Sequence, residues 1–177
     1  MKHVLMVIAP KDFRDEELFV PRQVLVDAGL SVTTASTQTG TATGMLGATE
    51  EITQTLDDIN ITDYQGLVVV GGMGSIDYLW PNTTLHGYIN NVFERQGMVS
   101  AICLSGAVLG LAGVLKGKKA TVWETPESRA AIEENGGIFT NEPVTVDGTL
   151  VTANGPDAAK AFGDALVQVL QNTLTHA

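Results

Sequence analysis

Short apolar runs rich in valine and isoleucine alternate along this chain with longer segments of helical period. Fully apolar runs of this kind are typical of parallel strands buried on both faces, and the helical segments between them supply the crossovers. The alternation predicts an α/β protein whose mostly parallel central sheet is covered by helices on both faces. Strands are expected at 3–9, 31–35, 67–70, 97–102 and 120–123, and helices at 15–28, 83–96, 105–115, 127–134 and from Gly155-Pro156 to about residue 170.

Turn residues refine this prediction. Asp147-Gly148, between two short apolar runs, is a strong signal for a two-residue β-hairpin. Residues 37–51 are rich in threonine and glycine and are expected to form a turn or small hairpin outside the main sheet. Pro21 should kink the first helix or reset its start. No repeat or linker interrupts the pattern, so residues 1–177 are predicted to form a single domain.

The charge of the chain limits its partners. Its formal net charge is −10, whereas sequence-independent binding to nucleic acid or to an anionic membrane needs clustered lysine and arginine. Neither partner is expected. The first apolar run, 3–9, is too short to span a bilayer and continues directly into the charged segment 11–17, unlike a signal peptide. A soluble, cytoplasmic protein is therefore predicted.

Cys103 is the only cysteine, and it stands where a buried strand is expected to turn into a helix. The unpaired N–H groups and the dipole at a helix N-terminus favour a thiolate over a thiol. The position therefore predicts a reactive cysteine. On this pattern alone, a small apolar residue packed between Ile102 and Leu104 in the core is an equally good interpretation.

Other polar groups are expected to converge on this cysteine, because ligands of open parallel sheets bind at the carboxyl ends of the strands. The predicted site has Cys103 as nucleophile, a carboxyl group from the first helix, and the N–H groups of Gly72 and Leu104 around a developing oxyanion. A carboxyl beside the sulfur should have a raised pKa, while the helix terminus keeps the sulfur ionised. The alternative for the carboxyl is an exposed position in the first helical turn.

Six segments are spread over nearly the whole chain: 12–17 with Pro21, 68–72, 101–103, 113–121, 146–148 and 155–156. In their order and spacing they resemble the ThiJ/PfpI superfamily. That superfamily includes PfpI-type intracellular proteases, the parkinsonism-associated deglycase and cofactor-independent glyoxalases. The resemblance implies a flavodoxin-like three-layer sandwich, a cysteine at a nucleophile elbow, and a homodimer or higher homo-oligomer.

The resemblance also implies roles for particular residues. The acid of the family lies four residues before a proline in the first helix, and Glu17 has that position before Pro21. The nucleophile of the family falls on Cys103, and the amides of its oxyanion pocket fall on Gly72 and Leu104.

This chain departs from the family at both expected histidines. Leu104 stands where the protease-like branch has histidine directly after the cysteine, and Trp123-Glu124 stands where the deglycase branch has one. Trp123, Glu124 and Gly71 are expected to line the pocket, and Glu124 or Glu17 to replace the missing base. The histidines that the chain does contain are expected to be structural or solvated: His3, His86 and His176.

Two classes of function follow. The first is a cysteine-dependent hydrolase or glyoxalase-like lyase acting on a small carbonyl compound or a peptide, with Cys103 as nucleophile and Glu17 as acid partner. The alternative is a redox-sensing or stress-protective protein in which Cys103 is oxidised. No cofactor or metal is predicted, because Gly72-Met73-Gly74 lacks a third glycine and the cysteine and histidines lack zinc spacing.

Overall fold

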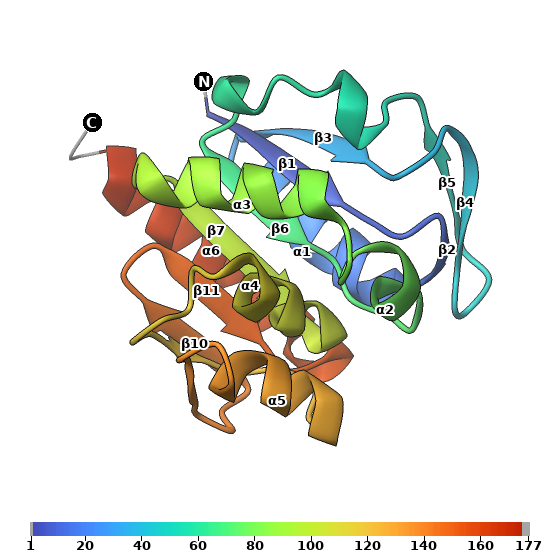
Figure 1. Cartoon of the computed structure of the whole chain (residues 1–177). Helices are drawn as coiled ribbons and strands as arrows, with labels where there is room; N and C mark the ends of the chain where they lie inside the picture. Colours follow the sequence, from blue (N-terminus) through green and yellow to red (C-terminus); the bar gives the residue numbers. More distant parts are fainter. Residues whose placement is uncertain (1, 175–177) are drawn as a thin grey trace.

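A six-stranded sheet forms the centre of the computed structural model, which describes residues 2–174 (Figure 1). Its strand order is β10-β11-β7-β6-β1-β3. Neighbouring strands are parallel except β10 and β11, which form the antiparallel hairpin predicted around Asp147-Gly148. The mostly parallel α/β fold is therefore confirmed. The strands are β1 His3–Val7, β3 Ser31–Ala35, β6 Gly66–Val69, β7 Met98–Ile102, β10 Val144–Asp147 and β11 Leu150–Ala153.

Helices cover both faces of this sheet because successive strand residues point to opposite sides. In β1, Leu5 belongs to a core cluster that contains residues of α3, α4 and α5, whereas Met6 belongs to a second cluster with residues of α1 and α6. Fully apolar strands are thus buried against a helical layer on each side. The helices are α1 Asp15–Asp27, α3 Thr83–Glu94, α4 Gly106–Ala112, α5 Pro126–Glu133 and α6 Ala159–Leu174.

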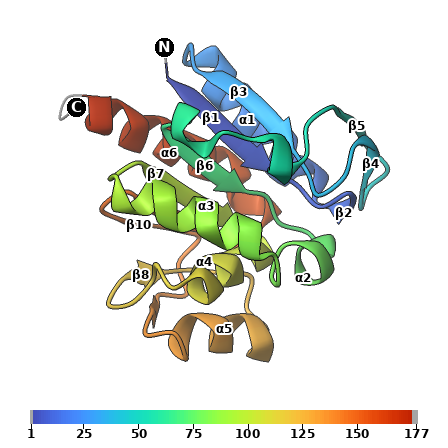
Figure 2. The same cartoon turned by 45° about the horizontal axis from the view of Figure 1, so that its top comes forward.

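A second, three-stranded sheet lies outside the main one, as expected for residues 37–51. Strand β4 (Gly40–Gly44) pairs antiparallel with β5 (Thr49–Ile52) and parallel with β2 (Lys11–Phe13). The sequence pattern did not predict strand β2. The turn between β4 and β5 is bound to α1, because the buried carboxylate of Asp15 accepts the backbone N–H groups of Leu46 at 3.0 Å and Ala48 at 2.9 Å. In two views the hairpin lies near α2 (Gly74–Tyr78) (Figures 1 and 2).

Several predicted boundaries are wrong. The strand expected at 120–123 is only β8 (Lys119–Ala120), which pairs with β9 (Ile138–Phe139) in a separate small sheet. Helix α4 ends early because Gly113 has a φ of 92°, a left-handed conformation that terminates helices. Helix α1 neither stops nor restarts at Pro21. The 3₁₀ turns are η1 Leu56–Asp58, η2 Ile61–Asp63, η3 Cys103–Ser105 and η4 Pro156–Ala158.

Within residues 2–174, no helix is long and apolar enough to cross a membrane.

Candidate active site

Parallel pairing brings the predicted site residues to one edge of the sheet. Strands β6 and β7 are in register, with Val69 opposite Ala101, so that the segments following them emerge side by side. Gly71 and Gly72 follow β6, and Cys103 follows β7 directly.

Cys103 has the backbone conformation of a sharp elbow. Its φ is +60°, which is uncommon for a residue other than glycine and indicates local strain. The carbonyl oxygen of Cys103 accepts the N–H of Trp123 at 3.1 Å, and that of Leu104 accepts the indole N–H of Trp80 at 3.0 Å. The backbone groups of Leu104 and Gly72 lower the pKa of the Cys103 thiol, and both residues line the same hollow as the sulfur.

The two glycines that follow β6 stand where there is no room for a side chain. A Cβ on Gly71 would lie 2.4 Å from Glu17 Oε1 and 2.6 Å from Cys103 Cβ. Gly72 has a φ of 109°, and a Cβ there would lie 2.4 Å from the backbone nitrogen of Arg14. Both residues therefore allow the segment after β6 to lie directly against the elbow and the first helix.

Glu17 is a fully buried carboxyl group beside the elbow. Its exposed fraction is 0%, and neither carboxyl oxygen has a partner of ordinary hydrogen-bond geometry among the described residues. Burial raises the pKa of Glu17 to about 8, an increase that interactions with the Cys103 thiol and the positive charge of Arg14 partly offset. The exposed position considered for this carboxyl is excluded, and its predicted pKa increase is found.

The prediction of an ionised sulfur is wrong for the resting site. Burial is the main reason why the pKa of the Cys103 thiol rises to about 12, and the negative charge of Glu17 adds to this rise. The backbone groups of Leu104 and Gly72 lower the pKa, but by less. The helix is also further away than expected, because α4 begins only at Gly106, after the 3₁₀ turn. Both shifts favour the protonated forms of the Glu17 carboxyl and the Cys103 thiol.

A small hollow of about 140 Å³ opens onto Cys103. It includes the predicted residues Gly72, Leu104 and Trp123. The sequence did not indicate its other lining residues, because the folded chain brings them from separate loops: Arg14, Met45, Met73 and Pro156. A larger hollow of about 460 Å³ is lined by Lys2 and Gly97, before the amino ends of β1 and β7, and contains none of the predicted site residues.

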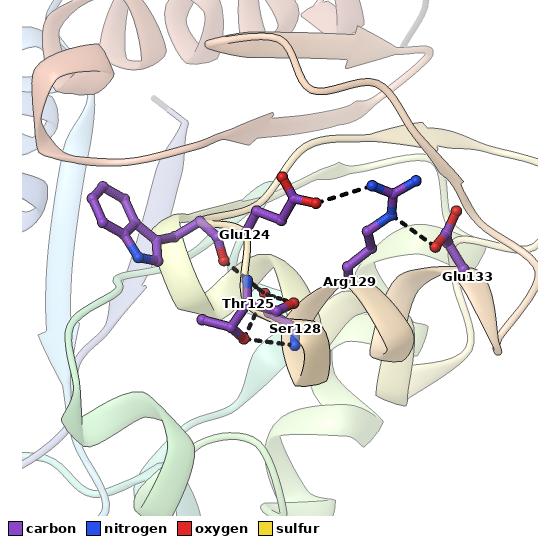
Figure 3. A network of polar contacts seen from close by, with 6 residues as sticks. Glu124, Thr125, Ser128, Arg129 and Glu133 are labelled. Atoms are coloured by element: carbon purple, nitrogen blue, oxygen red, sulfur yellow. Dashed lines mark hydrogen bonds and ion pairs between the residues drawn. The ribbon is translucent and has the colours of Figure 1, made fainter.

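Glu124 lies outside the hollow. Its carboxylate pairs with Arg129 Nη1 at 2.9 Å, beside the capped start of α5, and its side chain is 46% exposed (Figure 3). Because Arg129 also pairs with Glu133, Glu124 belongs to a surface network rather than to the pocket predicted for it. The predicted role of Glu124 as a replacement base has no geometric support.

The described histidines lie away from the sulfur. The His3 ring lies tilted against the Tyr64 ring and forms a hydrogen bond with the Thr33 hydroxyl, and the His86 ring forms one with the carbonyl oxygen of Trp80. His176 lies outside the described residues.

A buried hydroxyl pair supports the elbow and was missed in the sequence. Ser105 Oγ donates to the Val70 carbonyl oxygen at 2.6 Å, and Ser75 Oγ lies 2.7 Å from Ser105 Oγ. Ser75 belongs to α2, which follows Gly72, so the pair joins the segment after β6 to the segment after β7. The only available signal was the serine that follows Cys103-Leu104.

Comparison with known proteins agrees with this geometry. A sequence model of the DJ-1/PfpI family matches residues 2–169. The chain is 47% identical to an uncharacterised protein of Methanocaldococcus jannaschii, over 95% of this chain and 82% of that protein. It is 28% identical to a deglycase of Pyrococcus furiosus, over 94% and 99%. The crystal structure of a ThiJ/PfpI domain protein from Brachyspira murdochii has a TM-score of 0.90 at 29% identity and covers 96% of each chain. Because the family model matches residues 2–169 and a relative is 47% identical over nearly the whole chain, the chain belongs to the DJ-1/PfpI family.

Proposed function

We propose that this protein is a cysteine-dependent enzyme that converts small 2-oxoaldehydes by a glyoxalase-type reaction, with Cys103 as nucleophile and Glu17 as the group that moves protons. The observation that carries this proposal is the Glu17 carboxyl, fully buried beside the thiol with neither oxygen in a hydrogen bond of ordinary geometry among residues 2–174. Buried polar groups are normally satisfied, so an unsatisfied carboxyl beside a strained cysteine calls for a functional reason.

The first step forms a thiohemiacetal. The Cys103 sulfur bonds to the aldehyde carbon, the carbon–oxygen double bond becomes a single bond, and the thiol proton passes through Glu17 to the new oxygen. We expect the N–H groups of Gly72 and Leu104, which line the hollow together with Cys103, to stabilise the developing oxyanion.

The remaining steps need no external electron acceptor. Glu17 removes the hydrogen of the former aldehyde carbon as a proton, and a proton is added to the neighbouring carbonyl carbon. The hydroxyl proton on the first carbon passes to the oxygen of the second, so that the first carbon is oxidised to a thioester as the second is reduced to an alcohol. Water then hydrolyses the thioester, which releases a 2-hydroxy acid and restores the thiol.

The raised pKa of Glu17 suits this role. A general base is most effective when its pKa is close to the working pH, and the pKa of Glu17 is about 8. The carboxylate form, which removes the thiol proton, therefore becomes available near neutral pH. The pKa of about 12 for the thiol means that sulfur needs such a base in order to attack.

Two other functions have less support. Peptide hydrolysis needs a proton donor for the leaving amine, and the described histidines bond elsewhere. Peroxide sensing depends on thiolate character, which the raised pKa of Cys103 opposes. The 28% identity to a deglycase of Pyrococcus furiosus supports an enzyme rather than a sensor.

The test is turnover of methylglyoxal by the wild type, Cys103→Ala and Glu17→Gln, with formation of lactate measured directly. Wild-type turnover should fall at least about a thousandfold in Cys103→Ala and at least about a hundredfold in Glu17→Gln. Glu94→Gln, an exposed carboxylate at the end of α3, is the matched control and should leave the rate unchanged. Lactate formation that is unaffected by Cys103→Ala would contradict the proposal.

A further inference from the structure

The wall of the hollow at Cys103 is built from apolar side chains that stay partly exposed. Trp123 is 50% exposed, Met73 55% and Met45 38%, and all three line the hollow together with Cys103. Large apolar side chains around a concavity are typical of a binding site, because a ligand that covers them removes apolar surface from water.

Trp123 is held by hydrogen bonds of its backbone and by the packing of its ring. The N–H of Trp123 donates to Cys103, and its carbonyl oxygen accepts Ser128 Oγ at 2.6 Å. The Trp123 ring packs on Gly155, where a Cβ would lie 2.9 Å from ring atom Cε3. The wall is therefore in place before a ligand enters.

The two methionines belong to a turn and a loop that are also tied down. The Met45 N–H donates to the Phe13 carbonyl oxygen at 2.8 Å, within the turn that Asp15 binds. The Met73 N–H lies 3.5 Å from the Met45 sulfur. Thioether side chains adapt to the shape of an apolar group and make favourable contacts with aromatic rings.

No uncompensated charge lines the hollow. Arg14 is its one cationic lining residue, and the Arg14 guanidinium is bonded twice to the Glu16 carboxylate, Nε to Oε1 at 2.9 Å and Nη2 to Oε2 at 3.0 Å. A carboxylate substrate would have to displace Glu16 from this two-point contact. The space of about 140 Å³ corresponds to roughly five water molecules, which fits a small molecule.

We propose that the preferred substrates are uncharged 2-oxoaldehydes whose second substituent is aromatic or branched aliphatic, held against Trp123, Met45 and Met73. This inference rests on the proposed function and specifies its substrate class. Because one additional methylene group in an apolar pocket is worth about tenfold or more in specificity, an aryl substituent should raise kcat/KM over methyl by at least about tenfold.

The experiment compares initial rates for phenylglyoxal, methylglyoxal and glyoxylate, taken before these compounds modify arginine. The wild type should prefer phenylglyoxal over methylglyoxal by at least about tenfold and use glyoxylate worst of the three. Trp123→Ala should lower the phenylglyoxal-to-methylglyoxal ratio by about tenfold, mostly through KM. Val146→Ala, which truncates another half-exposed apolar side chain on β10, is the matched control and should keep the wild-type ratio.

A binding measurement keeps this inference separate from the proposed function. Acetophenone lacks the aldehyde, and its binding to Cys103→Ser is followed by ligand-observed NMR. Saturable binding that Trp123→Ala weakens about tenfold supports the apolar wall, even if no aldehyde is turned over. Turnover of methylglyoxal with no preference for phenylglyoxal, or a lack of saturable acetophenone binding, would overturn the inference. The first of these results would leave the proposed function standing.

Discussion

The backbone N–H of Trp123 donates a hydrogen bond to the carbonyl oxygen of Cys103 at 3.1 Å. The residue that forms one wall of the hollow is therefore fixed to the residue that carries the thiol. Cys103 is held at a φ of +60°, a conformation that persists only where surrounding contacts stabilise it. The hydrogen bond from Trp123 thus helps to hold the sulfur in its position at the hollow.

Substitution of Gly71 by alanine should damage both stability and activity. The new methyl group would lie 2.4 Å from Glu17 Oε1 and 2.6 Å from the Ile102 carbonyl oxygen, which is part of a strand end and has little freedom to move. We expect a loss of about 1–3 kcal/mol in the free energy of unfolding and at least a tenfold loss in turnover. Urea unfolding and the lactate assay measure the two effects.

The control for this substitution is Gly87→Ala on the exposed side of α3, where a Cβ would meet nothing within 4 Å. It should stabilise the protein by about 0.5–1 kcal/mol, since alanine is the better helix former. If Gly71→Ala matched the wild type in stability and turnover, the close packing of Glu17, Gly71 and Cys103 would be refuted.

Stability should fall as the pH rises from about 4.5 to about 8 because of Glu17. Its pKa is raised from 4.5 to about 8 in the folded protein, so in this window the folded state keeps a proton that the unfolded chain has released. The resulting stability is complete below about pH 4.5 and lost above about pH 8. Over the full window the loss is at most about 5 kcal/mol.

Glu17→Gln removes this titration. The variant should have a flatter dependence of unfolding free energy on pH and exceed the wild type in stability at pH 8. Urea unfolding at several pH values between 5 and 8 measures both, with Glu94→Gln as a control that keeps the wild-type slope. Equal slopes in the wild type and Glu17→Gln would show that Glu17 is not buried as described.

Asp15→Ala should loosen the hairpin that carries Met45. The substitution removes the acceptor for the N–H groups of Leu46 and Ala48, with an expected cost of about 1–3 kcal/mol in unfolding free energy. Hydrogen exchange at these two amides should become faster. Asp164→Asn, which breaks only an exposed ion pair with Lys160, should change stability by less than about 1 kcal/mol. Unchanged exchange in Asp15→Ala would refute its role.

The sheet was predictable because each strand carries its own signal. Runs such as 67–70 are apolar at every position, which is what burial on both faces requires. Strand β2 was missed because Lys11-Asp12-Phe13 has no such pattern and pairs only where β4 reaches it. Likewise, the short helix α2 follows a glycine-rich segment without helical periodicity.

The site was predictable in its position but not in its electrostatics. The meeting of Cys103, Glu17 and Gly72 follows from the strand ends and the family resemblance. The raised pKa of the thiol depends on burial that only the packed chain supplies. Glu124 was misplaced because its partner Arg129 becomes its neighbour only once α5 has formed. The homodimer or higher homo-oligomer implied by the resemblance stays a prediction, which light scattering can check.

Alkylation of Cys103 by iodoacetamide, followed by intact mass over a range of pH, tests most directly that Glu17 and Cys103 act as one pair. Because the chain has a single cysteine, the added mass that is absent in Cys103→Ala at the same pH reports this thiol. In the wild type the rate should be low at pH 7 and still rising above pH 9, the ordinary pKa of a thiol. In Glu17→Gln the profile should shift to lower pH, because the negative charge that raises the thiol pKa is gone. A wild-type rate that is already constant at pH 7, or identical profiles for the two proteins, would contradict the pairing of Glu17 with Cys103.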